Sequence, residues 1–131
     1  GAAEVTKHAA RMLTAPNSQP WNRANAACLI AAYKGREYLP TLIKLFTDDV
    51  ILIRANNQFP DIQVRDVVLA MALLLTEQDP KSYGFEIANK NPQARYNVTA
   101  FRFRDDQDQT ADDKRNAAFK KWSEWYSKQP Q

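Results

Sequence analysis

The sequence predicts an all-α fold, and three observations lead to this prediction. The 131 residues include only three glycines, whereas a β-rich sandwich or barrel usually has many glycine-containing turns. The longer apolar stretches are rich in alanine and leucine, which favour helices. An arginine also stands near the start of two apolar stretches, as Arg23 and Arg65, 42 positions apart. A repeat of about this period is typical of stacked helix pairs.

The first half of the chain predicts three helices. The chain length and the 44% of hydrophobic residues fit a single helical domain over residues 1–131. An amphipathic helix is expected over residues 4–14, before a proline-containing break at 15–20. A second helix over about 21–34 should end at Gly35, a natural left-handed C-terminal cap. Small side chains on one of its faces would let a neighbouring helix approach closely: Ala24, Ala27, Cys28 and Ala31.

The third helix should begin near Leu39, because Pro40 is tolerated only in a first turn. Residues 50–55 are β-branched and compatible with a short strand, but we interpret them as a connector that leads into a loop. The segment from Ile62 to about Gln78 is apolar nearly all round. It is therefore expected to be the central helix of the core.

The last part of the chain predicts an irregular insert and one more helix. Residues 79–109 have several aromatic side chains but little helical periodicity, so we expect an ordered loop that packs its aromatic rings. Thr110 opens the final helix, over about 111–128, with Asp113 three positions on, as in a capping box. The prediction is thus about five helices with a long insert before the last.

Residues 21–78 resemble two HEAT-type units, at about 21–48 and 61–78. The matching residues are Arg23-Ala24-Asn25-Ala26-Ala27, Leu39-Pro40-Thr41-Leu42-Ile43-Lys44-Leu45-Phe46-Thr47-Asp48, Asp61-Ile62-Gln63-Val64-Arg65 and Ala70. The resemblance implies HEAT/armadillo-like helical hairpins. It also implies a structural ion pair in which Arg65 binds either Asp48 or Asp61. Because the units are few and the insert is long, we expect a compact domain or the tail of a longer array.

Further strings are similar to uncharacterised bacterial domains with HEAT-like helices. They are Gln63-Val64-Arg65-Asp66, Thr76-Glu77-Gln78-Asp79-Pro80, Tyr83-Gly84-Phe85 and Lys121-Trp122-Ser123-Glu124-Trp125. This resemblance implies no known activity.

The charge pattern gives only a weak indication of nucleic-acid binding. The net charge is +3, and basic and acidic side chains are mixed along the chain. The candidate basic patch consists of Lys114, Arg115, Lys120 and Lys121, and acidic neighbours dilute it. We interpret it as a solvated helix face. The alternative function is a weakly basic nucleic-acid-binding domain, with Arg102 and Arg104 nearby, and it requires these cations to converge on one face.

The sequence has no recognisable catalytic motif, and we expect neither a cofactor nor a bound metal. His8 is the only histidine, no Gly-x-Ser-x-Gly motif is present, and three glycines form no phosphate loop. Cys28, the only cysteine, should be buried and inert. An enzyme that uses Asp66 or Glu77 remains a further hypothesis, and it needs a deep polar pocket around one of them.

The predicted function is therefore a non-catalytic helical scaffold or protein–protein interaction module, part of a longer protein. The candidate contact surface consists of Trp122, Trp125 and Tyr126, although their spacing favours packing of the last helix onto the core. The longest apolar run has nine residues, too few to cross a bilayer, so we expect a soluble chain. The start at Gly1 indicates a processed form or fragment, and whether an export signal preceded it stays open.

Overall fold

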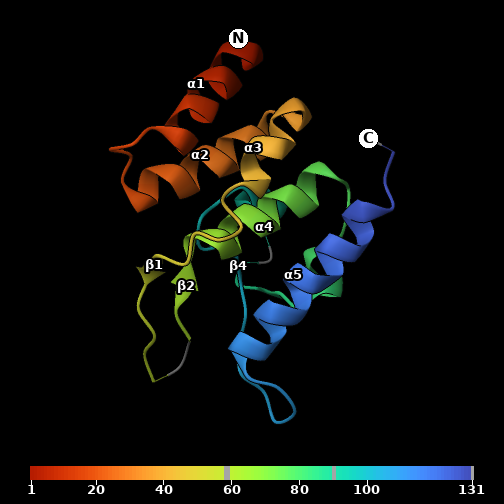
Figure 1. The fold of residues 1–131 in the computed structure, drawn as a ribbon. Coiled ribbons are helices and arrows are strands. Elements are labelled where there is room, and N and C mark those ends of the chain that lie inside the picture. Colours follow the sequence, from red (N-terminus) through yellow and green to blue (C-terminus); the bar gives the residue numbers. More distant parts are fainter. Residues whose placement is uncertain (58–59, 90, 131) are drawn as a thin grey trace.

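The computed structural model describes residues 1–57, 60–89 and 91–130. Within them, five α-helices follow one another along the chain (Figure 1): α1 (Ala2–Thr14), α2 (Pro20–Ala32), α3 (Leu39–Ile43), α4 (Val64–Leu75) and α5 (Ala111–Ser127). The predicted start of the third helix at Leu39 is confirmed, as is the start of the last helix. Thr110 caps α5 through its side-chain oxygen, which accepts a hydrogen bond from the Asp113 N–H at 3.1 Å.

The all-α prediction is wrong, because the largely helical domain also contains two small antiparallel sheets. Strand β1 (Ile51–Ile53) pairs with β2 (Ile62–Gln63), and β3 (Glu86–Ile87) pairs with β4 (Phe101–Arg102). β1 lies in the stretch interpreted as a connector, where β-branched side chains suit an extended backbone. The second sheet lies in the insert expected to be an irregular loop. In both segments, hydrogen bonding to a strand elsewhere in the chain determines the extended structure, and the local sequence pattern was too weak to predict it.

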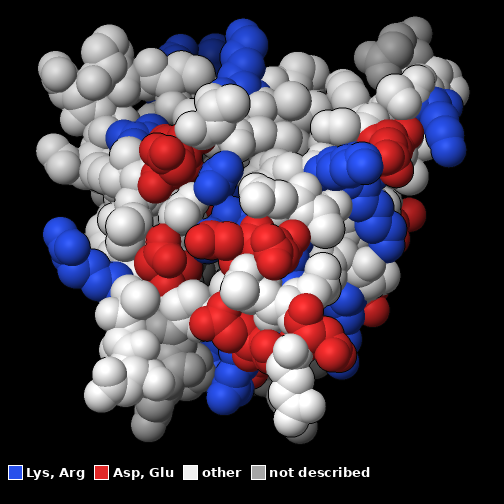
Figure 2. All heavy atoms as spheres, turned by 60° about the horizontal axis from the view of Figure 1, so that its bottom comes forward, with Lys and Arg blue, Asp and Glu red and all other residues white. Residues whose placement is uncertain are grey.

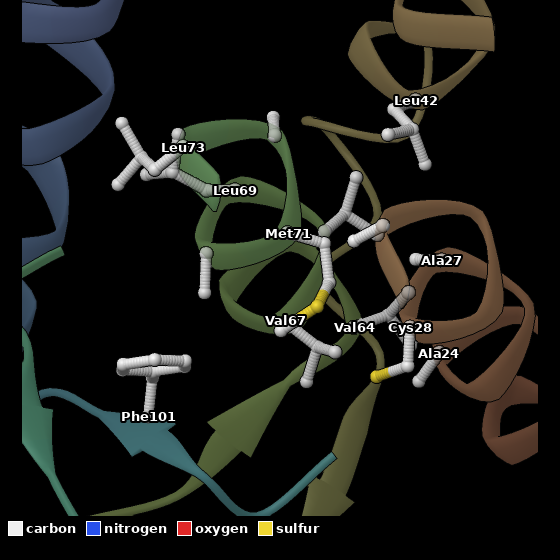
Figure 3. Close-up of a cluster of buried hydrophobic side chains, with 14 of the residues drawn as sticks. Ala24, Ala27, Cys28, Leu42, Val64, Val67, Leu69, Met71, Leu73 and Phe101 are labelled. Atoms are coloured by element: carbon white, nitrogen blue, oxygen red, sulfur yellow. The ribbon is translucent and has the colours of Figure 1, made fainter. Parts of the chain in front are cut away.

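Helix α4 is the centre of the core, as predicted, but it is shorter than the expected helix from Ile62 to about Gln78, because Ile62 and Gln63 pair with β1 and the helix ends at Leu75. Ten of its twelve residues are buried. α1 packs on α2, and α2 packs on α4, so the three helices form successive layers (Figure 1). On one side of α4, Val64 and Met71 face Ala24, Ala27 and Cys28 of α2 (Figure 3). These small side chains let the two helices approach closely. Leu69 and Leu73 lie on the opposite side of α4.

The end of α2 differs from the prediction in an informative way. The left-handed residue is Lys34, with φ of 56°, whereas Gly35 has φ of −79°. Gly35 is required for space instead. A Cβ atom there would lie 3.0 Å from Thr6 Cγ2 of α1 and 3.2 Å from Ile30 Cγ2. The glycine therefore allows the start of α1 to approach the end of α2.

Gly35→Ala is expected to lower the free energy of unfolding by about 1–3 kcal/mol, because the new methyl group overpacks the contact with Thr6 and Ile30. Lys34→Gly is the matched control. It should stabilise the protein by up to about 1 kcal/mol, because glycine adopts positive φ without the steric cost that lysine bears. Urea denaturation measures both values. Equal effects of the same sign would contradict this account of the α2 end.

Among the described residues, no helix combines the length and the apolar character that crossing a membrane requires.

Candidate functional site

The predicted ion-pair residues have other partners in the structure. Asp48 Oδ2 lies 2.9 Å from Nε of Arg23, not beside the Arg65 guanidinium. Arg65 donates from Nε to Oε1 of Gln63 at 2.6 Å, and its guanidinium lies 5.8 Å from the ring centre of Phe119. The Asp61 carboxylate accepts a hydrogen bond from the side-chain amide of Gln63, with Nε2 and Oδ2 3.0 Å apart. Arg65 is linked to Asp48 only through the backbone, where its N–H donates to the Asp48 carbonyl at 2.9 Å.

A buried ion pair lies one position further along the chain, between Asp66 of α4 and Arg115 of α5. Arg115 Nε lies 2.7 Å from Asp66 Oδ1, and Nη2 lies 2.8 Å from Oδ2. Both side chains are 1% exposed. Nη2 also donates to the Asp61 carbonyl at 3.2 Å, and Nη1 binds the Asp112 carboxylate. Asp66 further accepts the Gln63 N–H at 2.9 Å, which caps the start of α4.

Burial and the charge of the partner shift the pKa values of Asp66 and Arg115 in opposite directions. Burial raises the pKa of Asp66, while the hydrogen bonds and positive charge of Arg115 oppose that rise. Burial favours neutral Arg115, but the hydrogen bonds and negative charge of Asp66, with the charges of Asp61 and Asp112, outweigh burial and raise the pKa of Arg115. The pair therefore joins α4 to α5 as a closed bidentate contact. Because solvent does not reach either group, the pair offers no position for a substrate.

The candidate basic patch does not form an open cationic surface. Lys114 Nζ lies 2.7 Å from Asp106 Oδ2. This contact, together with hydrogen bonds from the backbone N–H groups of Gln109 and Asp108, lowers the pKa of Asp106 to about 2. Lys121 Nζ donates to the Ser82 carbonyl at 2.6 Å and lies 4.5 Å from the ring centre of Tyr83. With Arg115 buried, Lys120 is the one member without a partner among the described residues.

The face of the molecule that carries the N-terminal end of α5 is acidic. Figure 2 shows Asp and Glu side chains across the middle of this face, with Lys and Arg around them. Residues 105–113 contain five aspartates and neither lysine nor arginine. Arg102 and Arg104, which the nucleic-acid hypothesis uses, lie 3.4 and 3.5 Å from the Glu86 carboxylate. Such a surface repels phosphate groups rather than attracting them.

The candidate contact surface on α5 is largely internal. Trp122 is 2% exposed and stacks on Tyr126, with ring centres 5.7 Å apart. Phe46, which follows α3, meets Trp122 edge to face at 5.6 Å and Phe119 at 5.2 Å. Trp125 and Tyr126 are half-buried. This arrangement favours the packing interpretation, in which the aromatic side chains fasten α5 to the rest of the core.

Two of the hollows at the surface bear on the enzyme hypothesis. One, of about 500 Å³, lies at the C-terminal end of α4 and includes Glu77 beside Leu74 and Phe101. The other, of about 570 Å³, lies at the start of α5 and includes Asp61, Asp105 and other polar residues. Neither contains Asp66. Among residues 1–57, 60–89 and 91–130, no three His, Cys, Asp or Glu side chains are arranged to hold a metal ion.

One helix face is both exposed and free of charge. We call it the α2 face, and its residues are Trp21, Asn22, Asn25, Leu29, Ala32 and Tyr33. Trp21 is 44% exposed, Leu29 42% and Tyr33 48%. At about 100° per residue, these six positions fall within an arc of about 120°. A surface helix normally has charged residues on such an arc, and here every side chain is uncharged.

Sequence reasoning missed the α2 face because it concentrated on the small side chains of the opposite face. A signal was present, since no charged residue occurs between Arg23 and Lys34. A helix without charges over that length is either surrounded by protein or has a face for a partner.

Burial makes Cys28 unreactive in the folded protein. The thiol is 4% exposed, and burial raises its pKa to about 12. Because the thiolate is the reactive form, a thiol reagent at pH 8 should label Cys28 only after unfolding. Labelling followed by mass spectrometry, with and without urea, measures this. Rapid stoichiometric labelling without urea would contradict the buried placement.

A scan against protein-family models and searches among curated proteins and solved structures gave no match. The HEAT-like resemblance of residues 21–78 therefore stays a prediction.

Proposed function

We propose that this domain is a non-catalytic protein-interaction module and that the α2 face is its docking surface. The observation that carries this proposal is the uncharged, exposed arc with Trp21, Leu29 and Tyr33 on one helix. Tryptophan and tyrosine contribute strongly to the affinity of protein interfaces, whereas charged residues are depleted from interface cores. The α2 face combines both properties.

The fold supports this role by holding α2 rigidly. α2 packs on α1 and on α4, and six of its thirteen residues are buried. A surface on a packed helix loses little conformational freedom when a partner binds.

The contacts on α4 and α5 give less support to the other hypotheses. Asp66 is engaged by Arg115 inside the core, so it is unavailable as a general acid or base. Glu77 lines a hollow that is open to solvent, and its carboxylate has neither an ion pair nor a hydrogen bond among the described residues. Three of the four candidate basic-patch residues have protein partners.

Leu29→Asp tests the proposal. The substitution places a charge at the centre of the α2 face and should abolish capture of specific protein partners. It should change the free energy of unfolding by less than about 1 kcal/mol, because the side chain is 42% exposed. The measurement is affinity capture with quantitative mass spectrometry, comparing wild type and variant.

Ala117→Asp is the matched control, because it adds the same charge at an exposed position of α5. Partners that depend on the α2 face should remain bound to this control. Partners retained by Leu29→Asp but lost from Ala117→Asp would contradict the proposal.

A further inference from the structure

We propose that the partner of the α2 face is an amphipathic helix with acidic residues beside its apolar stripe. This inference rests on the proposed function and specifies the chemistry of the partner. Three features of the described residues support it: the hydrogen bonding of α2, the small area of the face, and the charges next to it.

The first feature is that the α2 face offers only side chains. The backbone groups within α2 form hydrogen bonds along the helix. At its C-terminal end, the Tyr33 N–H donates to the Leu29 carbonyl, and the Gly35 N–H donates to the Ile30 carbonyl. A partner therefore gains no backbone hydrogen bonds here, as it would at a sheet edge. The partner must therefore form its backbone hydrogen bonds within itself, as a helix does. From Trp21 to Tyr33 the face is about 18 Å long, which matches about twelve residues of a partner helix.

The second feature is the area of the face. A large aromatic side chain offers roughly 200 Å², and less than half of each of Trp21, Leu29 and Tyr33 is exposed. Their exposed parts therefore sum to roughly 300 Å². A stable dimer of folded proteins needs about 800 Å² from each partner. The three large side chains of the α2 face therefore fall well short of that area, and they suit a single helix better than a second copy of the chain.

The third feature is the charge next to the face. Lys34 follows Tyr33 directly, and Arg36 lies two positions further on. Both are exposed, and neither has an acidic partner among the described residues. Glu37 is the only acidic residue in this turn. Lys34 and Arg36 would therefore attract carboxylates of a partner at this end of the α2 face and would repel its ammonium groups.

The test is selection of displayed 16-residue peptides on the full chain. The library fixes leucines at i, i+3, i+4 and i+7 within a helix-forming frame and randomises the flanking positions. We expect the selected peptides to be enriched in Asp and Glu and to become helical on binding, as measured by circular dichroism. Their affinity should fall at least tenfold with Leu29→Asp and should be unchanged with Ala117→Asp.

A charge reversal separates the partner chemistry from simple apolar binding. The double variant Lys34→Glu, Arg36→Glu should weaken the acidic peptides by about fivefold to tenfold, and a peptide with lysines in place of its acidic residues should recover binding to this variant. Enrichment of neutral or basic peptides that still require Leu29 would overturn the inference but not the proposed function. Selected peptides that bind equally to Leu29→Asp would count against both.

Two other results would also overturn the inference. Failure of the library to yield any binder would exclude a helix of this kind. Self-association of the wild-type chain in sedimentation experiments, lost with Leu29→Asp, would assign the face to a second copy.

Discussion

Arg115→Met is expected to lower the free energy of unfolding by about 3–5 kcal/mol, the usual cost of breaking a buried ion pair from one side. The substitution leaves the Asp66 carboxylate buried without its bidentate partner. Urea denaturation followed by circular dichroism measures the loss. Lys120→Met, an exposed position on the same helix, should change stability by less than about 0.5 kcal/mol.

The pH dependence of the Arg115→Met variant identifies the cause of the loss. Burial raises the pKa of Asp66 above its ordinary value of 3.8, and without Arg115 less opposes this rise. The folded variant then binds more protons than the unfolded chain, so its stability should increase as the pH falls from 7 toward 4. Adding Asp66→Asn removes the buried charge and should restore part of the stability at pH 7. A pH-independent loss would contradict the ion-pair account.

Trp122→Ala should destabilise the protein by about 3–5 kcal/mol, because it removes a large buried ring and leaves a cavity between α5 and Phe46. The edge-to-face contact with Phe46 and the stack on Tyr126 are lost with it. Circular dichroism in urea measures the effect. Trp122→Phe, which keeps an aromatic ring, should give an intermediate loss.

Trp21→Ala is the control for this prediction. Trp21 is 44% exposed, so its removal should cost less than about 1 kcal/mol. Equal losses for Trp122→Ala and Trp21→Ala would contradict the assignment of Trp122 to the core and of Trp21 to the surface.

The sequence was sufficient to predict the helices whose periodicity is strong. The apolar stretch from Ile62 onward predicted the core position of α4, and Thr110 predicted the start of α5. The strands were not predictable in this way. β3 and β4 have two residues each, and they exist because residues far apart in the chain pair with one another. Short strands carry too little local pattern to be identified.

The polar contacts depended even more on tertiary structure. Arg115 shares a helix face with Ala118 and Trp122, and that position could have indicated burial. Its partner Asp66 is 49 positions away, so their pairing follows only from how α4 and α5 pack. The resemblance to HEAT units implied that Arg65 binds Asp48 or Asp61, whereas in the folded chain Asp48 pairs with Arg23. Arg65 and Asp61 both bond the side chain of Gln63 instead. Of the proposed docking surface, only the missing charges between Arg23 and Lys34 were visible in the sequence.

The three tryptophans lie in three different environments. Trp21 is open to solvent on the α2 face, Trp122 is enclosed, and Trp125 is half-buried beside it. Acrylamide should therefore quench the emission of Trp21 far more than that of Trp122, and a ligand on the α2 face should protect Trp21 alone. Unfolding should instead shift the emission of Trp122 to longer wavelength. Intrinsic fluorescence can thus distinguish occupancy of the α2 face from loss of the fold without any attached label.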